Sequence, residues 1–384
     1  MNAMAEPIAV LRLALTDFRN YAHIVLDADA RPLVLTGANG AGKTNLLEAV
    51  SLLVPGRGLR GAGFDALARA GGSGGWAVSA DVDGLVGPVR IGTGLDAETV
   101  GARAARTVRI DRGPVPVNSL GEHVTALWLT PAMDGLFTGP AAERRRFVDR
   151  LTLALDPGHG AQAARFERLM RQRNRLLADE RPDARWLDAV ETEMAGAAVA
   201  VAAARRETVL QLSSAQARRD SGRDLFPAFD ICIEGDLEAA LETASATATE
   251  DAYLEGLGNA RSQDAAAGRT LAGPHRSDLA VTHLGKGVAA AIASTGEQKA
   301  LLIGLTLAHA QIVAERSGRS RPPLLLLDEI AAHLDDMRRE ALFERILALG
   351  CQAWMTGTDR ALFGAIAHAA QTFEVSGASV SPWR

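Results

Sequence analysis

Residues 37–44 have the types and spacing best suited to chemistry. They read Gly-Ala-Asn-Gly-Ala-Gly-Lys-Thr, which matches the phosphate-binding pattern G-x-x-x-x-G-K-[ST]. The glycines let backbone N–H groups close on phosphate oxygens, and the helix that follows adds partial positive charge there. We expect Lys43 to reach the β- and γ-phosphates of ATP, and the Thr44 hydroxyl to bind Mg²⁺. The predicted nucleotide-binding residues are Gly37, Ala38, Asn39, Gly40, Ala41, Gly42, Lys43, Thr44 and Asn45.

Two acidic residues form a second candidate for chemistry. Asp328 and Glu329 follow the four leucines of residues 324–327, as in the Walker B pattern. We expect Asp328 to help hold Mg²⁺, and Glu329 to orient and polarise the attacking water as a base. Paired acids after a buried strand are common, so this pattern gains its weight from the phosphate-binding loop in the same chain. The predicted catalytic residues are Glu329, Lys43 and Asp328.

A third stretch stands just before a predicted helix. It consists of Ser294, Thr295, Gly296, Glu297 and Gln298. The Ser294 hydroxyl and the Gly296 amide at a helix start are good anion ligands. Ser-x-x-Glu is also an ordinary capping box. The residues alone leave both interpretations open, and they are compatible.

Alternating helices and apolar strands must position these groups. Residues 31–36 read as a short apolar strand, and residues 45–53 have helical spacing. Residues 300–315 are predicted to form a helix, and residues 324–327 a fully buried strand. This pattern at both ends of the chain predicts one α/β domain that an insertion divides.

The character of the chain changes near residues 140 and 268. Between them, two runs with helical spacing, separated by Pro182, predict a helical hairpin. We therefore expect residues 1–140 and 268–384 to form an α/β head, and residues 141–267 a helical arm.

Composition limits the classes of function. The formal net charge of −5 excludes a generally basic nucleic-acid coat, so any DNA site must be a local patch. Cys232 and Cys351 are the only cysteines, which excludes a disulfide framework. The longest apolar stretch, residues 300–313, is too short and polar to cross a membrane. Because Glu6 and Pro7 interrupt the N-terminus before any apolar run, we expect a cytoplasmic protein without membrane contact.

Taken together, the motifs give the chain a family resemblance. It resembles the RecF family of bacterial recombinational DNA-repair proteins, which is related to the ATPase heads of SMC and Rad50 proteins. The residues that carry the resemblance are 18–21, 37–45, 47–49, 60, 139–140, 143–147, 149, 173–174, 176–177, 273–276, 294–299, 327–329 and 356–359.

The resemblance implies an ABC-type P-loop ATPase head, with a lobe I, a lobe II and an inserted helical arm. It implies a homodimer, assembled head to tail around ATP and Mg²⁺, in which residues 294–298 contact the nucleotide of the opposite subunit. Residues 331–335 resemble the D-loop of this superfamily, with Asp335 as its acidic residue. The resemblance also implies binding to double-stranded DNA at gap junctions, action with RecR and RecO, loading of RecA, and slow ATP turnover.

Basic residues offer candidates for the DNA contact. Arg60 resembles the loop arginine of SMC-type heads, and the arm carries arginines at helical spacing. The predicted DNA-binding residues are Arg60, Arg165, Arg168 and Arg171. For the arginines of the arm, which also include Arg173, Arg175 and Arg205, a solvated helix face is the simpler interpretation.

Three positions depart from the pattern of many ABC ATPases. Thr130-Pro131 stands where they carry a glutamine, and Thr358 or Asp359 replaces the usual switch histidine. Glu297 stands where transporters have a second glycine. A transporter subunit is therefore disfavoured as an alternative function. Glu329 argues against a second alternative, a clamp that binds ATP without turnover.

Overall fold

The computed structural model describes residues 7–97, 106–179, 183–218, 225–316, 321–332 and 334–383. Glu6 and Pro182, used in the predictions above, and His333 of the predicted D-loop lie outside these ranges. Backbone contacts divide the chain into two compact units. Unit 1 comprises Met1–Asp134, Gly222–Phe226 and Leu302–Arg384, and unit 2 comprises Gly135–Ser221 and Pro227–Leu301. The predicted division into head and arm at residues 140 and 268 stays a prediction.

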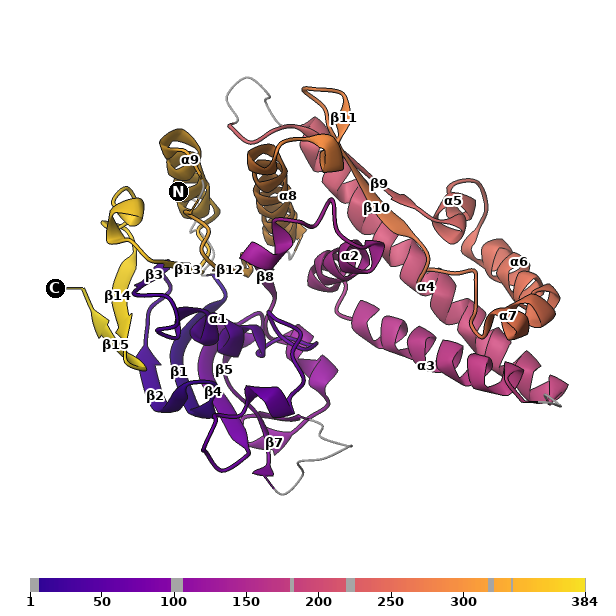
Figure 1. The fold of residues 1–384 in the computed structure, drawn as a ribbon, viewed down its shortest axis with the longest axis horizontal. Helices are drawn as coiled ribbons and strands as arrows, with labels where there is room; N and C mark the ends of the chain where they lie inside the picture. The colour runs from indigo at the N-terminus through magenta and orange to yellow at the C-terminus, as the bar shows by residue number, and fades with distance from the viewer. Residues whose placement is uncertain are drawn as a thin grey trace. The chain divides into compact units, whose positions relative to one another are not determined.

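A mostly parallel sheet forms the centre of unit 1 (Figure 1). Its strand order is β15 (Ser379–Pro382), β14 (Gln371–Ser376), β3 (Leu33–Thr36), β13 (Ala353–Gly357), β12 (Leu324–Leu327) and β8 (Ala126–Leu129). All pairs are parallel except β14 with β15. The strands β3, β12, β13 and β8 are buried along their whole length. Strands covered on both faces need continuous apolar sequence, which explains the run of leucines in β12.

An antiparallel sheet forms the second layer of unit 1. Its order is β2 (Tyr21–Asp27), β1 (Ala9–Phe18), β4 (Trp76–Gly84), β5 (Gly87–Leu95), β6 (Thr107–Ile110) and β7 (Gly113–Pro114). Helix α1 (Lys43–Ser51) contacts both β1 and β13, so it lies between the two sheets. The remaining elements of the unit are η1 (Asp65–Leu67), η3 (Val117–Glu122), η4 (Pro131–Met133), α9 (Asp336–Leu349) and η6 (Arg360–Phe363).

Unit 2 is mainly helical. It contains α2 (Ala141–Leu155), α3 (His159–Leu177), α4 (Ala184–Ala217), α5 (Asp236–Thr243), α6 (Ala246–Asn259), α7 (Arg261–Ala267) and η5 (Ala290–Ile292). Helices α3 and α4 pack along each other, so the predicted hairpin is confirmed (Figure 1). A small sheet of β11 (Val288–Ala289), β10 (Asp278–His283) and β9 (Phe229–Glu234) completes the unit. Helix α8 (Thr295–Arg316) begins in unit 2 and ends in unit 1.

Two arginines correct the prediction of a solvated helix face. Arg173 on α3 has no exposed surface, and Arg205 on α4 is 5% exposed. Both lie in line with apolar core positions, where a long side chain can reach acidic partners inside the unit. Their spacing places both on a buried helix face, but it does not identify the acidic partners, which come from other parts of the chain.

In the part of the chain that the structure describes, no helix is long and apolar enough to cross a membrane.

Candidate nucleotide site

The glycine-rich loop joins β3 to α1 in a conformation that requires glycine. Gly37, Gly40 and Gly42 have φ angles of 152°, 79° and 113°. A Cβ atom on Gly37 would lie 2.2 Å from the Val375 carbonyl oxygen, and one on Gly42 would lie 2.5 Å from the Tyr21 hydroxyl. Side chains at these positions would be both strained and blocked. The loop therefore presents bare backbone just before the start of α1, where phosphate oxygens are favoured.

Lys43, the first residue of α1, lies under this loop. Its side chain is 4% exposed, and the ammonium donates to the Gly37 and Ala38 carbonyl oxygens at 2.8 and 3.1 Å. The same Nζ atom lies 3.5 Å from Glu329 Oε1. A compact cation in this position can serve a phosphate group next to the loop.

The predicted magnesium residues are in direct contact. The Thr44 hydroxyl donates to Asp328 Oδ1 at 2.8 Å, although the two residues are far apart in sequence. Asp328 is 7% exposed and follows β12, while Thr44 follows β3 through the glycine loop. Strands β3, β13 and β12 are parallel neighbours, so their carboxyl ends meet at one edge of the sheet. A hydroxyl and a carboxylate oxygen are hard ligands of the kind that Mg²⁺ prefers, so the donor set fits the ion.

Thr356, at the end of β13, is a further site residue that the sequence analysis did not assign. Its hydroxyl donates to Asp328 Oδ1 at 2.8 Å and accepts from the Glu329 amide at 2.8 Å. Thr356 therefore holds both acidic residues. Its position at the carboxyl end of a buried parallel strand is the sequence feature that could have predicted its place in the site.

Glu329 has unusual backbone geometry. Its φ angle is +50°, in the left-handed region that non-glycine residues seldom adopt. Its side chain is 26% exposed, so its carboxylate can meet water while Asp328 stays enclosed. Backbone strain of this kind tends to be held at functional sites by surrounding contacts, here by Thr356.

A polar network supports the outer side of α1. The buried carboxylate of Glu48 accepts from Arg19 Nε and Nη2 and from Arg60 Nη1, each at 2.8 Å. Arg60 also donates to Asn45 Oδ1 at 2.8 Å, and Asn45 donates to Asn20 Oδ1 at 2.7 Å. This group, which we call the Glu48 network, links α1 to the β1–β2 turn and to the loop that carries Arg60. The structure thus ties Arg60, a predicted DNA residue, to the nucleotide-site helix.

The predicted signature residues lie in unit 2, at the start of α8. Ser294, Thr295 and Gly296 are exposed. Glu297 accepts from the Ser294 amide and hydroxyl at 3.1 and 2.9 Å, so part of the capping box is present. The ion pair with Lys286, together with these hydrogen bonds, lowers the pKa of Glu297 to about 2. Gln298 points inward and donates to the Ala293 carbonyl oxygen at 2.8 Å.

The remaining predicted residues are on the surface. Asp335 caps α9 by accepting from the Arg338 amide at 2.8 Å. Arg165, Arg168 and Arg171 are exposed on α3. Arg165 pairs with Glu193 and Arg171 with Glu167, both of which are exposed acidic residues.

No cluster of three or more histidine, cysteine, aspartate or glutamate side chains in the described ranges could hold a metal ion. A magnesium site built from Thr44, Asp328 and the phosphates themselves does not need such a cluster.

Comparisons with known proteins agree with this geometry. Residues 9–378 match the family described as the RecF/RecN/SMC N-terminal domain. The chain is 52% identical to the DNA replication and repair protein RecF of Rhizobium meliloti, over 98% of this chain and 100% of the relative. It is likewise 52% identical to the RecF protein of Agrobacterium fabrum, over 97% of this chain and 98% of the relative.

Solved structures show the same fold. A structure described as the recombination mediator protein RecF with ATP superposes with a TM-score of 0.86 at 19% identity, covering all of both chains. An Smc head domain from Pyrococcus furiosus superposes with a TM-score of 0.54 at 14% identity, covering 97% of this chain and 95% of the other. The predicted α/β fold of the ABC-type ATPase head is therefore confirmed. With its sequence matched to RecF proteins over nearly its whole length, the chain belongs to the RecF family.

Proposed function

We propose that this chain is an ATP-dependent DNA-binding protein of recombinational repair that hydrolyses ATP slowly to reset its assembly. The observation that carries the proposal is the meeting of Lys43, Thr44, Asp328 and Glu329 at the edge of one parallel sheet. The relatives that the chain matches are named DNA replication and repair protein RecF, which supports the same role.

Each of these side chains has a distinct task in the proposal. Lys43 binds the β- and γ-phosphates, while Thr44 and Asp328 hold Mg²⁺, which neutralises phosphate charge when it is bound. Glu329 orients the attacking water and accepts its proton. Thr356 acts as a positioning residue, because it fixes the Asp328 carboxylate and the Glu329 backbone relative to each other.

A homodimer completes the proposed site. The exposed Ser294, Thr295 and Gly296 would contact the γ-phosphate bound to the glycine loop of a second copy. Glu297 accepts from the Ser294 hydroxyl and pairs with Lys286, so the Lys286 charge offsets its own, and Ser294 would exchange this partner for the phosphate. ATP binding then drives dimerisation, and hydrolysis releases it.

DNA and repair proteins are the proposed partners. Double-stranded DNA at gap junctions would be held by the dimer, which would act with RecR and RecO to load RecA. Arg60, Arg165, Arg168 and Arg171 remain the predicted DNA contacts. The exposed ion pairs of Arg165 and Arg171 are weak enough for DNA phosphates to replace.

Replacing Glu329 by glutamine tests the proposal. Glutamine keeps the shape of the side chain but cannot accept a proton, so phosphate release should fall by about 100-fold or more. ATP should still bind and should drive the variant into a long-lived dimer with increased retention of DNA. Phosphate release, light scattering and binding to a labelled gapped duplex measure these effects.

Two further variants are controls. Lys43→Met should lose ATP binding itself, because it removes the compact charge beside the phosphates. Glu344→Gln, which alters an exposed acid on α9, should behave as the wild type. Wild-type hydrolysis by Glu329→Gln would show that Glu329 is not the base. An ATP-bound variant that stays monomeric at high concentration would refute the dimer.

A further inference from the structure

Two sequence motifs with no role in the nucleotide site meet in unit 2. One is residues 143–146 on α2, and the other is the turn of residues 273–277, which leads into β10. Arg144 donates twice to Asp278, from Nε at 2.7 Å and from Nη2 at 2.6 Å. Arg145 Nη1 donates to the Ser277 carbonyl oxygen at 2.8 Å. The two motifs therefore form one site, although most of unit 2 separates them along the chain.

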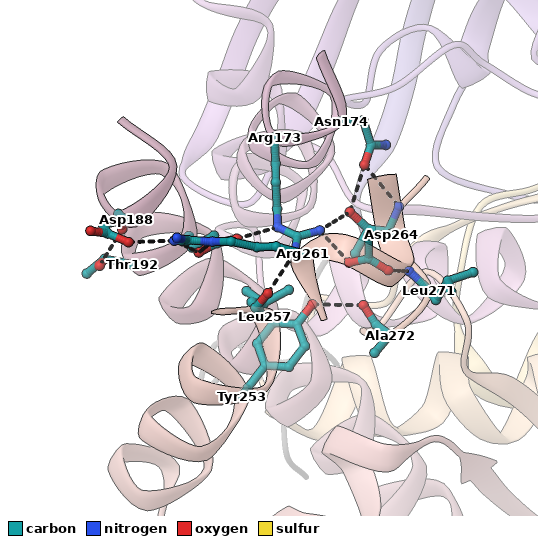
Figure 2. A network of polar contacts seen from close by, with 12 residues as sticks. Arg173, Asn174, Asp188, Thr192, Tyr253, Leu257, Arg261, Asp264, Leu271 and Ala272 are labelled. Carbon is teal, nitrogen blue, oxygen red and sulfur yellow. Dashed lines mark hydrogen bonds and ion pairs between the residues drawn. The ribbon is translucent and has the colours of Figure 1, made fainter. Parts of the chain in front are cut away.

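Buried hydrogen bonds fix the conformation of the segment before this turn. Arg173 is fully buried and donates to Thr270, to Asp264 and to the Leu257 carbonyl oxygen (Figure 2). Asn174 Oδ1 accepts from the Thr270 amide and hydroxyl at 2.9 and 2.8 Å. These contacts, which we call the Arg173 network, also include Glu191 and Arg261. The network holds the chain in place where it enters the turn.

The hydrogen bonds continue along the segment. Asp264 Oδ1 accepts from the Leu271 amide at 3.0 Å, and Tyr253 donates to the Ala272 carbonyl oxygen at 2.9 Å (Figure 2). Gly273 has a φ angle of 128°, and a Cβ atom there would lie 2.4 Å from the Tyr253 hydroxyl. Successive residues are thus held by different partners, which gives the segment a single conformation.

Arg205 holds the turn itself. It donates from Nη1 to the Pro274 carbonyl oxygen at 2.6 Å and to Ser277 Oγ at 3.0 Å. Its other nitrogens donate to both carboxylate oxygens of Asp149 at 2.7 and 2.9 Å. The side chain of Arg276, in the middle of this fixed turn, is exposed.

Two arginines at this site, Arg145 and Arg276, add positive charge beyond the paired groups. Arg144 is paired with Asp278 and Arg205 with Asp149. Within the described ranges, Arg145 and Arg276 form no ion pair with a carboxylate. Burial lowers the pKa of Arg145, the nearby charges of Arg205 and Arg276 lower it further, and those of Asp278 and Asp149 act in the opposite direction. Two cationic side chains without a carboxylate partner thus lie close together on a fixed turn, where an added anion would be favoured.

A polyanion suits this site better than a protein surface does. None of the exposed large apolar side chains of the described residues lies on α2 or in residues 270–277. Protein interfaces usually include a buried apolar centre, whereas phosphate backbones are bound through arginine side chains on fixed elements. The guanidinium group can also donate two parallel hydrogen bonds to one phosphate.

We propose that Arg276 and the neighbouring Arg145 form a contact site for the phosphate backbone of duplex DNA. Arg276 lies on the turn of residues 273–277, whose conformation is fixed by hydrogen bonds. The proposal rests on the proposed function and adds to it a DNA contact on unit 2 apart from α3. The Arg173 network acts by positioning the turn and does not touch DNA.

The test is binding of a fluorescent gapped duplex to the full chain with ATP, measured at several salt concentrations. The affinity of a protein for duplex DNA falls with salt with a slope of about −0.9 per phosphate contact. Arg276→Gln should therefore reduce the magnitude of the slope by about 0.9 and weaken binding roughly eightfold at 0.1 M salt. Arg145→Gln should have a similar effect.

Arg112→Gln, on the exposed β6–β7 turn of unit 1, removes the same charge and should leave the slope unchanged. ATP binding and the unfolding midpoint of Arg276→Gln should match those of the wild type, because its side chain holds no part of the fold. An Arg276→Gln variant with the wild-type slope would overturn the site while leaving the proposed function in place. A wild type that fails to bind the duplex would overturn both.

Discussion

The Glu48 network of unit 1 and the Arg173 network of unit 2 are built from the same chemistry, but they differ in access to water. In each, two arginines converge on a buried glutamate. The arginines of the Glu48 network keep 21% and 41% of their side-chain surface exposed. In the Arg173 network Arg261 keeps 27%, but Arg173 keeps none and donates to three kinds of acceptor: carboxylate, hydroxyl and backbone carbonyl (Figure 2).

The difference indicates what each network does. A buried arginine such as Arg173 must be satisfied within the protein, so it fixes a single arrangement of the chain, which here is the segment entering residues 273–277. Arginines that reach water can exchange partners at small cost. We infer that the Arg173 network is structural and that the Glu48 network leaves the loop of Arg60 adjustable.

Removing the buried Arg173 should give the largest effect on stability. Arg173→Met keeps the length of the side chain but leaves Asp264 and Glu191 short of a buried partner. The free energy of unfolding should fall by about 3–5 kcal/mol, measured by urea denaturation. Arg175→Met, two residues along α3 on the exposed side, is the matched control and should change little. Equal effects of the two substitutions would contradict the assigned role of burial.

Replacing the central glutamate of each network by glutamine sharpens the comparison. Glu191→Gln should lower the free energy of unfolding by about 3 kcal/mol, because Arg173 cannot reach water. Glu48→Gln should cost only about 1–2 kcal/mol, since Arg19 and Arg60 can turn towards solvent. The two variants are to be compared in the same denaturant titration. A greater loss for Glu48→Gln would mean that the exposed network is the stronger one.

Arg60→Gln should have the smallest effect. A partly exposed ion pair contributes about 1 kcal/mol or less, so the free energy of unfolding should hardly change. The same variant tests the predicted DNA role of Arg60, because a lost phosphate contact would reduce the slope of duplex affinity against salt. A strong loss of stability here would show that the Arg60 loop is as fixed as the turn of residues 273–277.

The chemistry of the nucleotide site could be predicted from the sequence because its backbone geometry is local. The glycines of residues 37–42 must adopt φ angles that only they tolerate, and Lys43 and Thr44 follow at fixed spacing. The four leucines of β12 predict a strand that is buried on both faces, and the carboxyl end of this strand positions Asp328 and Glu329. Short-range patterns of this kind also predicted the parallel strands and the helical hairpin.

Only the tertiary structure decided which distant side chains meet. Thr356 joins the site because β13 happens to lie between β3 and β12. Arg173 and Arg175 have the same residue type and lie on the same helix, yet one is sealed inside and the other faces water. Arg173 lies on the buried face of α3, and acidic partners from α4 and α7 satisfy its charge there. Helical spacing predicts the face of the helix on which a residue lies. A charge can be buried there only if partners from other parts of the chain pair with it, and the spacing does not predict those partners.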